Sequence, residues 1–195
     1  MRSLIPPFAL MLTLAAGAIL GGPSAAPLQA QTPSAGMPGT GQHAGDPMSA
    51  DAMRDSTRAF LSMMVDHHQG LIAMSDSARA RATRASTKAD AHTLRDEQAR
   101  EQRRMETMLR RTYHDSTQPK VLPSNQAMLD TLSRASGADY DRTFYRFVIE
   151  HHRQAIGMID QALPHLTPEV RRMATEMRSK QQREIAQLER KMRAV

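Results

Sequence analysis

Two pairs of adjacent histidines, His67-His68 and His151-His152, stand at matching places in two similar segments of the chain. The segments are FLSMMVDHHQGLIAMSDSA (residues 60–78) and FYRFVIEHHRQAIGMIDQA (residues 144–162), whose numbers differ by 84 throughout. Imidazole is the commonest metal ligand among side chains and also forms hydrogen bonds readily. Two pairs kept in an otherwise apolar helical pattern indicate a metal-binding function. The alternative is a duplicated helical hairpin whose histidines only form hydrogen bonds in its core.

A glutamine and a glutamate recur in the segments that follow the histidines. They are Gln98 and Glu101 in the first copy and Gln181 and Glu184 in the second, with the same Gln-x-x-Glu spacing in both. Alternating steps of four and three residues keep side chains on one helix face, and these polar residues fall on faces that are otherwise apolar. A carboxylate in a core needs a partner, which we expect to be an imidazole of the facing helix. Such a contact orients the ring and leaves its other nitrogen free for a metal.

The two histidines of each pair lie on different sides of their helix. The same steps place His67 and His151 among apolar neighbours at the centre of the helix face. One residue further turns the helix by about 100°, which puts His68 and His152 on a flank. We therefore expect the first histidine of each pair to point toward the centre of the molecule.

The hydrophobic pattern from residue 51 onward is helical almost throughout. It predicts a helix over about 51–84, a second one after Ser86-Thr87 to about Tyr113, a short helix capped by Ser124, a third long helix over 139–164, and a last helix that begins with Thr167-Pro168. Four long helices with short connections within each pair predict an all-α, antiparallel four-helix bundle of the ferritin-like type. It would consist of two repeated hairpins, over about 51–114 and 124–195.

The first 50 residues differ in composition from the rest. Residues 1–30 begin with a charged residue, continue with an apolar stretch and end in small residues, a pattern typical of a secretory signal peptide cleaved after Ala26 or Ala30. Residues 31–50 are rich in Pro, Gly, Ser and Ala and predict a disordered linker. We therefore expect the bundle domain, residues 51–195, in the periplasm or otherwise secreted, without a stable membrane anchor.

Composition restricts the chemistry that the chain can perform. It contains no cysteine and 15 methionines, which excludes disulfides, thiolate metal sites and thiol catalysis. Imidazole together with thioether suits copper, particularly Cu(I), and zinc is an alternative because imidazole and carboxylate bind it as well. The net charge of +6 is accompanied by no aromatic platform or nucleic-acid motif, so we expect no specific nucleic-acid partner.

Several of these motifs, in the same order and twice, resemble the domain of unknown function 305 family. Residues 64–69 (MVDHHQ) with Met74, preceded by Phe60, resemble its signature. The two Gln-x-x-Glu segments resemble its second-helix pattern, and Tyr140-Asp141 before Phe144 resembles the start of its second repeat. The resemblance covers residues 51–195. It implies a ferritin-like four-helix architecture, and some exported members of the family are copper-binding proteins of the periplasm.

The resemblance also implies a set of metal ligands in this chain. The candidates are His67, His68, Met64, Met74, His151, His152 and Met158, supported by Gln98, Glu101, Gln181 and Glu184. Val148 stands where a counterpart of Met64 is expected, which makes the second half a weaker thioether site.

Three functions compete. We expect a protein that buffers or carries copper without turnover, rather than an enzyme, as a monomer or a homodimer, with a metal ion and other exported metal-handling proteins as its partners. The second function is a ferritin-like di-metal oxidase that uses iron. That class uses Glu-x-x-His motifs, and the sequence contains none. The third is a helical bundle without metal that binds a partner protein through a methionine-rich surface.

Overall fold

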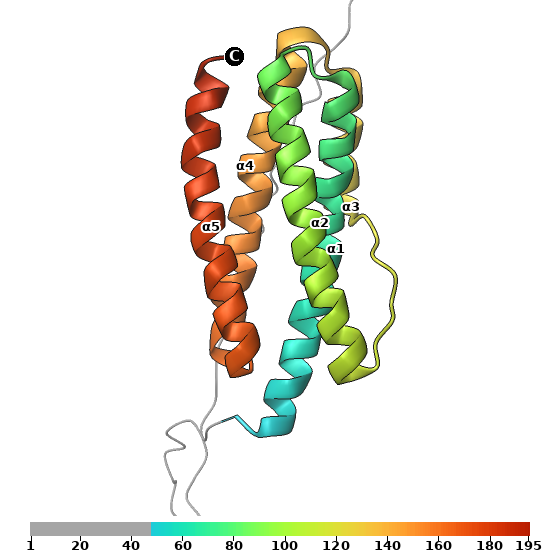
Figure 1. The fold of residues 1–195 in the computed structure, drawn as a ribbon, viewed down its shortest axis with the longest axis vertical. Coiled ribbons are helices and arrows are strands. Elements are labelled where there is room, and N and C mark those ends of the chain that lie inside the picture. Colours follow the sequence, from blue (N-terminus) through green and yellow to red (C-terminus); the bar gives the residue numbers. More distant parts are fainter. Residues whose placement is uncertain (1–47) are drawn as a thin grey trace, which may run out of the picture. The chain divides into compact units, whose positions relative to one another are not determined.

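The computed structural model describes residues 48–195, and every regular element among them is helical (Figure 1). In chain order the elements are α1 (Ala50–Arg81), α2 (Ala85–Tyr113), α3 (Pro123–Arg134), α4 (Gly137–Ala162), a 3₁₀ turn (Leu163–His165) and α5 (Pro168–Arg193). The predicted signal peptide, and the predicted linker up to residue 47, lie outside the described residues. None of the described helices is long and apolar enough to cross a membrane.

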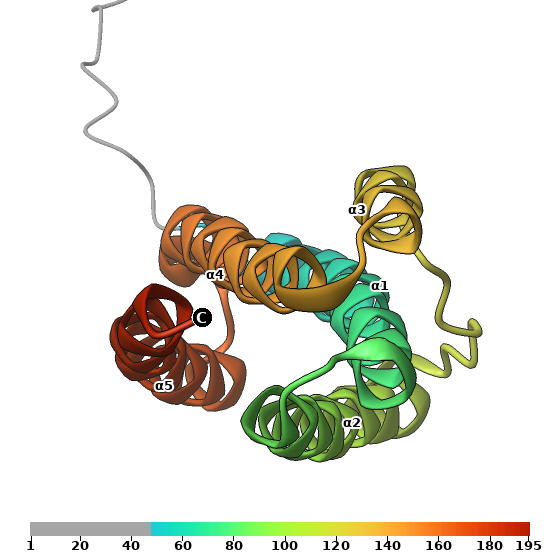
Figure 2. The same cartoon turned by 90° about the horizontal axis from the view of Figure 1, so that it is seen from above.

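The four long helices form a bundle, which confirms the predicted all-α fold. α1 and α2 form one antiparallel hairpin, and α4 and α5 form the other (Figure 1). The hairpins pack against each other through α1 and α4, and the short α3 lies against both (Figure 2). α2 and α5 lie on the opposite side from α3, each beside the first helix of its own hairpin (Figure 2).

A buried carboxylate of the second hairpin holds the connection between α1 and α2. Asp141 of α4 accepts hydrogen bonds from the backbone N–H of Thr83 (3.0 Å), from the Thr83 hydroxyl (2.7 Å) and from the backbone N–H of Arg84 (3.0 Å). These bonds use the donors that a longer helix would need. α1 therefore ends at Arg81 and not at the predicted residue 84.

The connection between α4 and α5 makes the matching contact on the first hairpin. The backbone N–H of Thr167 donates to Oγ1 of Thr57 on α1, at 2.9 Å. When the two similar segments are aligned on their histidine pairs, Thr57 corresponds to Asp141 and Thr83 corresponds to Thr167. Equivalent positions of the two halves thus hold each other's connections. Thr167 precedes the first turn of α5 as predicted, but its own hydroxyl forms no cap hydrogen bond.

Three helices begin earlier than predicted. α2 begins at Ala85, so the predicted break at Ser86-Thr87 lies in its first turn. α3 begins with Pro123, so the predicted cap Ser124 lies inside the helix. Proline suits the first helical position, where its missing N–H is not needed. α4 begins at Gly137 rather than at Asp139, and the φ of 57° at Gly137 is one that glycine adopts without strain.

The buried apolar side chains form two clusters, one on each side of the histidines. One cluster contains Met64 and the other contains Met74, and both draw residues from α1 and α4. His67 and His151 stand between the clusters along these two helices. The histidines therefore interrupt the apolar core where the two hairpins meet.

α3 approaches α1 closely at one glycine. A Cβ atom at Gly70 would lie 2.0 Å from Nδ2 and 2.7 Å from Cβ of Asn125 on α3. Asn125 is fully buried, so it cannot turn out into solvent to make room. Gly70 follows His67 by less than one turn, and the contact fixes α3 against the same stretch of α1.

A candidate metal centre

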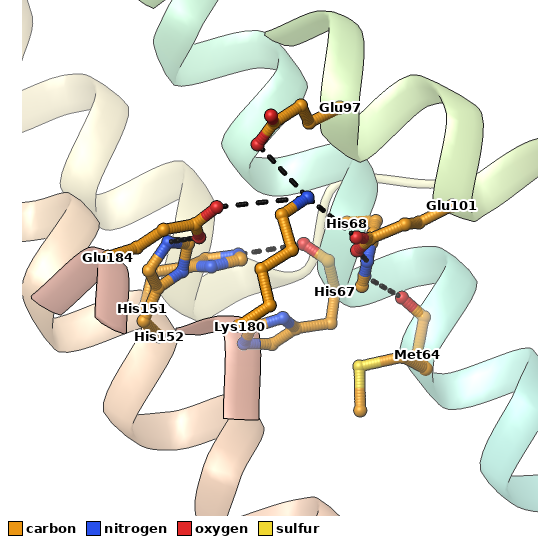
Figure 3. Close-up of polar contacts among 9 residues, drawn as sticks. All are labelled: Met64, His67, His68, Glu97, Glu101, His151, His152, Lys180 and Glu184. Carbon is orange, nitrogen blue, oxygen red and sulfur yellow. Dashed lines mark hydrogen bonds and ion pairs between the residues drawn. The ribbon is translucent and has the colours of Figure 1, made fainter. Parts of the chain in front are cut away.

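The first histidines of the two pairs meet at the contact between α1 and α4. The ring centroids of His67 and His151 are 3.7 Å apart and their planes are inclined by 35°. Both side chains are buried, with 3% and 0% of their surface exposed. The prediction that they point toward the centre of the molecule agrees with this arrangement, which Figure 3 shows from the side of α2 and α5.

Most nitrogens of this ring pair have no hydrogen-bond partner. His151 Nε2 donates to the backbone carbonyl of His67 at 2.9 Å. This assigns its proton to Nε2 and leaves Nδ1 with a lone pair and no partner. Neither ring nitrogen of His67 has a partner with hydrogen-bond geometry among the described residues, although the side chain of Gln154 interacts with the ring and slightly opposes the lowering of its pKa. Buried polar atoms usually do have one, so these nitrogens require an explanation.

Both rings are neutral at ordinary pH. Burial, followed by the neighbouring His68 and His152, lowers the pKa of His67 from 6.5 to about 3. Burial, and then the proximity of His67, lowers the pKa of His151 well below its usual value. A neutral imidazole presents a lone pair without first losing a proton, as metal binding requires.

His68 is fully used in hydrogen bonds. Its Nδ1 donates to the carbonyl of Met64 at 2.9 Å, and its Nε2 contacts Oε2 of Glu101 at 3.1 Å. Although burial alone would raise the pKa of Glu101, the bonds and charges of His68 and Lys180 lower it to about 2. Because Nδ1 faces the carbonyl and Nε2 faces the carboxylate, neither ring nitrogen of His68 is open to a further ligand in this arrangement.

His152 makes the corresponding contact in the second hairpin, but less completely. Its Nε2 lies 2.8 Å from Oε2 of Glu184, outside the angles of a hydrogen bond, and neither ring nitrogen has a hydrogen-bond partner among residues 48–195. Burial alone would raise the pKa of Glu184, but the contact with His152 and the charge of Lys180 lower it.

The carboxylates thus contact imidazoles of the facing helix as expected, but the flank histidines are the ones involved. The pair His67 and His151 points across the contact between the hairpins. A turn of about 100° directs the next residue toward α2 or α5 of its own hairpin, where Glu101 and Glu184 lie. The neighbouring Gln98 and Gln181 are buried, and Oε1 of the first and both amide atoms of the second have no partner within the described part of the chain.

The predicted thioether ligands do not gather in one place. Met64 is fully buried one turn before His67, and Met158 packs against the same apolar cluster. Met74 belongs to the other cluster. Met74 and Met158 each follow the first histidine of their pair by seven residues, about 10 Å along a helix. Within residues 48–195, no three His, Asp or Glu side chains are close enough together to hold one metal ion.

Sequence reasoning missed two residues that complete the polar cluster. Lys180 of α5 places Nζ 2.9 Å from Oε1 of Glu101, 3.0 Å from Oε2 of Glu97 and 3.7 Å from Oε1 of Glu184 (Figure 3). Burial lowers the pKa of Lys180, but Glu101 and the other carboxylates outweigh this and raise it. The signal was present in the sequence: when the two Gln-x-x-Glu segments are aligned, Lys180 is the counterpart of Glu97.

A pocket of about 280 Å³ opens between α2 and α5 beside this cluster. Met173 and Met177 line it together with Glu101 and Lys180. Solvent in this pocket therefore reaches the carboxylate of Glu101 and the ammonium group of Lys180, whereas the His67–His151 pair is buried in the core.

The protein is thus an all-α bundle of two hairpins with paired histidines between them. The chain matches the family model "Domain of unknown function (DUF305)" twice, over residues 21–109 and 58–192. It therefore belongs to the DUF305 family, which confirms the resemblance seen in its motifs. No curated protein matches the chain.

Solved structures of the same family share the fold. A DUF305 fragment from Deinococcus radiodurans is 24% identical, with a TM-score of 0.65 over 72% of this chain and 97% of that one. The protein CopM is 26% identical over 71% of this chain and 96% of its own, with TM-scores of 0.61 in its Cu(I)-bound form and 0.60 in its Cu(II)-bound form.

Proposed function

We propose that this protein binds copper, as Cu(I), where α1 and α4 meet, and that it acts in the periplasm or otherwise outside the cell as a copper buffer or carrier. The proposed ligands are the imidazoles of His67 and His151 and the thioether of Met64. The copper-bound structures of CopM support the choice of metal. The signal-like residues 1–30 support export.

The observation that carries the proposal is the set of unpartnered imidazole nitrogens in the core. His67 contributes two and His151 one. Leaving a buried polar group without a partner costs about 1–3 kcal/mol. A bound metal would use one lone pair from each neutral ring and offset part of that cost. The low pKa of His67, about 3, means that protons compete with the metal only in strong acid.

The surroundings of the ring pair favour a soft metal. The nearby carboxylates Glu101 and Glu184 are engaged by the flank histidines and by Lys180. Magnesium and calcium require oxygen ligands, whereas Cu(I) accepts imidazole and thioether. Met64 lies three residues before His67, on the same helix face, and is the thioether best placed to complete the site.

The other predicted ligands receive different roles in this proposal. His68 and His152 orient the carboxylates on the flank, and Gln98 and Gln181 fill the buried space beside them. Met74 and Met158 pack in the apolar clusters.

Competition with a chromophoric Cu(I) chelator under anaerobic conditions tests the proposal. Loss of an outer-shell partner typically weakens metal binding 10–100-fold, so His67→Ala and His151→Ala should each weaken Cu(I) binding by about 100-fold or more. Met64→Leu should weaken it, whereas the matched Met74→Leu should not. His92→Ala, at an exposed position of α2, is the control for histidine in general. Folded His67→Ala and His151→Ala variants that keep the affinity of the wild type would refute the proposed site.

A further inference from the structure

Three carboxylates and one ammonium group form a mixed cluster between α2 and α5. Glu97 and Glu101 come from α2, and Glu184 and Lys180 come from α5 (Figure 3). All four side chains are partly buried, with 15–29% of each exposed. Nζ of Lys180 lies within 4.0 Å of an oxygen of each of the three carboxylates, so its ammonium group stands between them.

The two hairpins differ at this point in charge. In the alignment of the two Gln-x-x-Glu segments, Glu101 corresponds to Glu184 and Glu97 corresponds to Lys180. Three of the four equivalent positions therefore carry a carboxylate, and the fourth carries a cation that offsets part of their charge. Without Lys180, only the imidazoles of His68 and His152 would contact these carboxylates, and their mutual repulsion would be costly because the charges are partly buried.

Buried imidazoles adjoin the same cluster from the other two helices. His68 of α1 contacts Glu101 at 3.1 Å, and His152 of α4 lies 2.8 Å from Glu184. His152 is fully buried and neither of its nitrogens has a hydrogen-bond partner among the described residues. Carboxylates and imidazoles that converge from four helices are the ligand set of di-metal carboxylate bundles. These are also ligands that suit zinc, manganese and iron.

We propose that Lys180 determines metal specificity by occupying, with its ammonium group, the position that a divalent cation would take among Glu97, Glu101 and Glu184. The inference rests on the proposed function and extends it. The bundle would then exclude divalent metals from its carboxylate–imidazole cluster and admit Cu(I) at the His67–His151 pair. An ammonium group in this position would prevent the cluster from serving as the metal site of a di-metal oxidase.

The test removes the ammonium group by substitution and measures whether the variant gains a binding site for a divalent metal. Lys180→Gln should bind one Co(II), seen by its visible d–d absorption, at least about tenfold more tightly than the wild type, which corresponds to about 1.4 kcal/mol. Lys191→Gln is the matched control, because Lys191 also joins α5 to α2 but pairs with the single carboxylate of Asp90. It should leave Co(II) binding at the level of the wild type. Lys180→Arg, which keeps the positive charge, should do the same.

Adding Glu184→Gln to Lys180→Gln should abolish the new site. If Lys180→Gln does not fold in the absence of metal, restoration of its helical circular dichroism by Co(II) supports the proposal. No restoration overturns it. A folded Lys180→Gln protein with the Co(II) affinity of the wild type also overturns it.

Cu(I) binding is measured separately on the same proteins. Lys180→Gln should keep the Cu(I) affinity of the wild type within about threefold, a difference below about 1 kcal/mol. Absence of Cu(I) binding by the wild type would refute the proposed function, while the Co(II) result would still decide whether Lys180 blocks a divalent site. The two failures are therefore distinguishable.

Discussion

Replacing His67 with leucine should remove part of the pH dependence of stability in the metal-free protein. The folded ring has a pKa of about 3 and the ordinary value is 6.5. Below pH 6.5 the unfolded chain therefore takes up a proton that the folded protein cannot hold, so stability falls as the pH is lowered toward 3. Between pH 7 and pH 5 this linkage lowers the free energy of unfolding by about 2 kcal/mol for His67 alone. The lowered pKa of His151 acts in the same direction.

Urea denaturation of the metal-free proteins at pH 7 and pH 5 measures this change. The wild type should lose about 2 kcal/mol more than His67→Leu over this interval. Met64→Leu, a volume-conserving change at a fully buried site one turn earlier, should lose as much as the wild type. Equal losses for the wild type and His67→Leu would show that the folded ring accepts a proton without cost. The buried, neutral imidazole would then be the wrong description of this site.

Two further predictions concern contacts that hold the helices in place. Gly70→Ala would put a Cβ atom 2.0 Å from Nδ2 of Asn125 and should lower the free energy of unfolding by about 2 kcal/mol. Gly157→Ala, with open space around it, should raise the free energy of unfolding by up to about 1 kcal/mol. Equal effects of the two substitutions in urea denaturation would contradict the close packing of α3. Asp141→Ala removes a buried carboxylate with three hydrogen bonds and should cost about 3–5 kcal/mol, against about 1 kcal/mol for Thr57→Val. A smaller loss for Asp141→Ala than for Thr57→Val would rule out its proposed role in holding the connection.

The features that sequence periodicity predicts best are local to one helix. The steps that place His67 and His151 on an apolar helix face depend on about two turns of sequence, and the structure buries both side chains there. The same reasoning found that Glu101 and Glu184 need imidazole partners. It did not find that these partners are His68 and His152, because the rotation of one helix relative to its neighbour is set by packing over the whole hairpin.

Contacts between the hairpins lie beyond such reasoning. Asp141 ends α1 from a distant part of the sequence, and no local pattern around Arg81 indicates it. The local sequence around Lys180 predicts an ordinary solvated lysine on an amphipathic helix. Its role becomes visible only when the two copies are aligned and the lysine falls opposite Glu97.

Copper binding at the buried ring pair can be followed atom by atom by ¹⁵N NMR of the histidine side chains. Long-range ¹H–¹⁵N spectra identify the tautomer of each ring and the nitrogen that a metal engages. Before copper is added, His151 should carry its proton on Nε2, because that atom donates to the carbonyl of His67. One equivalent of Cu(I) should shift Nδ1 of His151 and one nitrogen of His67, and should leave His92, His114 and His165 unchanged. Shifts confined to these three histidines would contradict a metal site in the core.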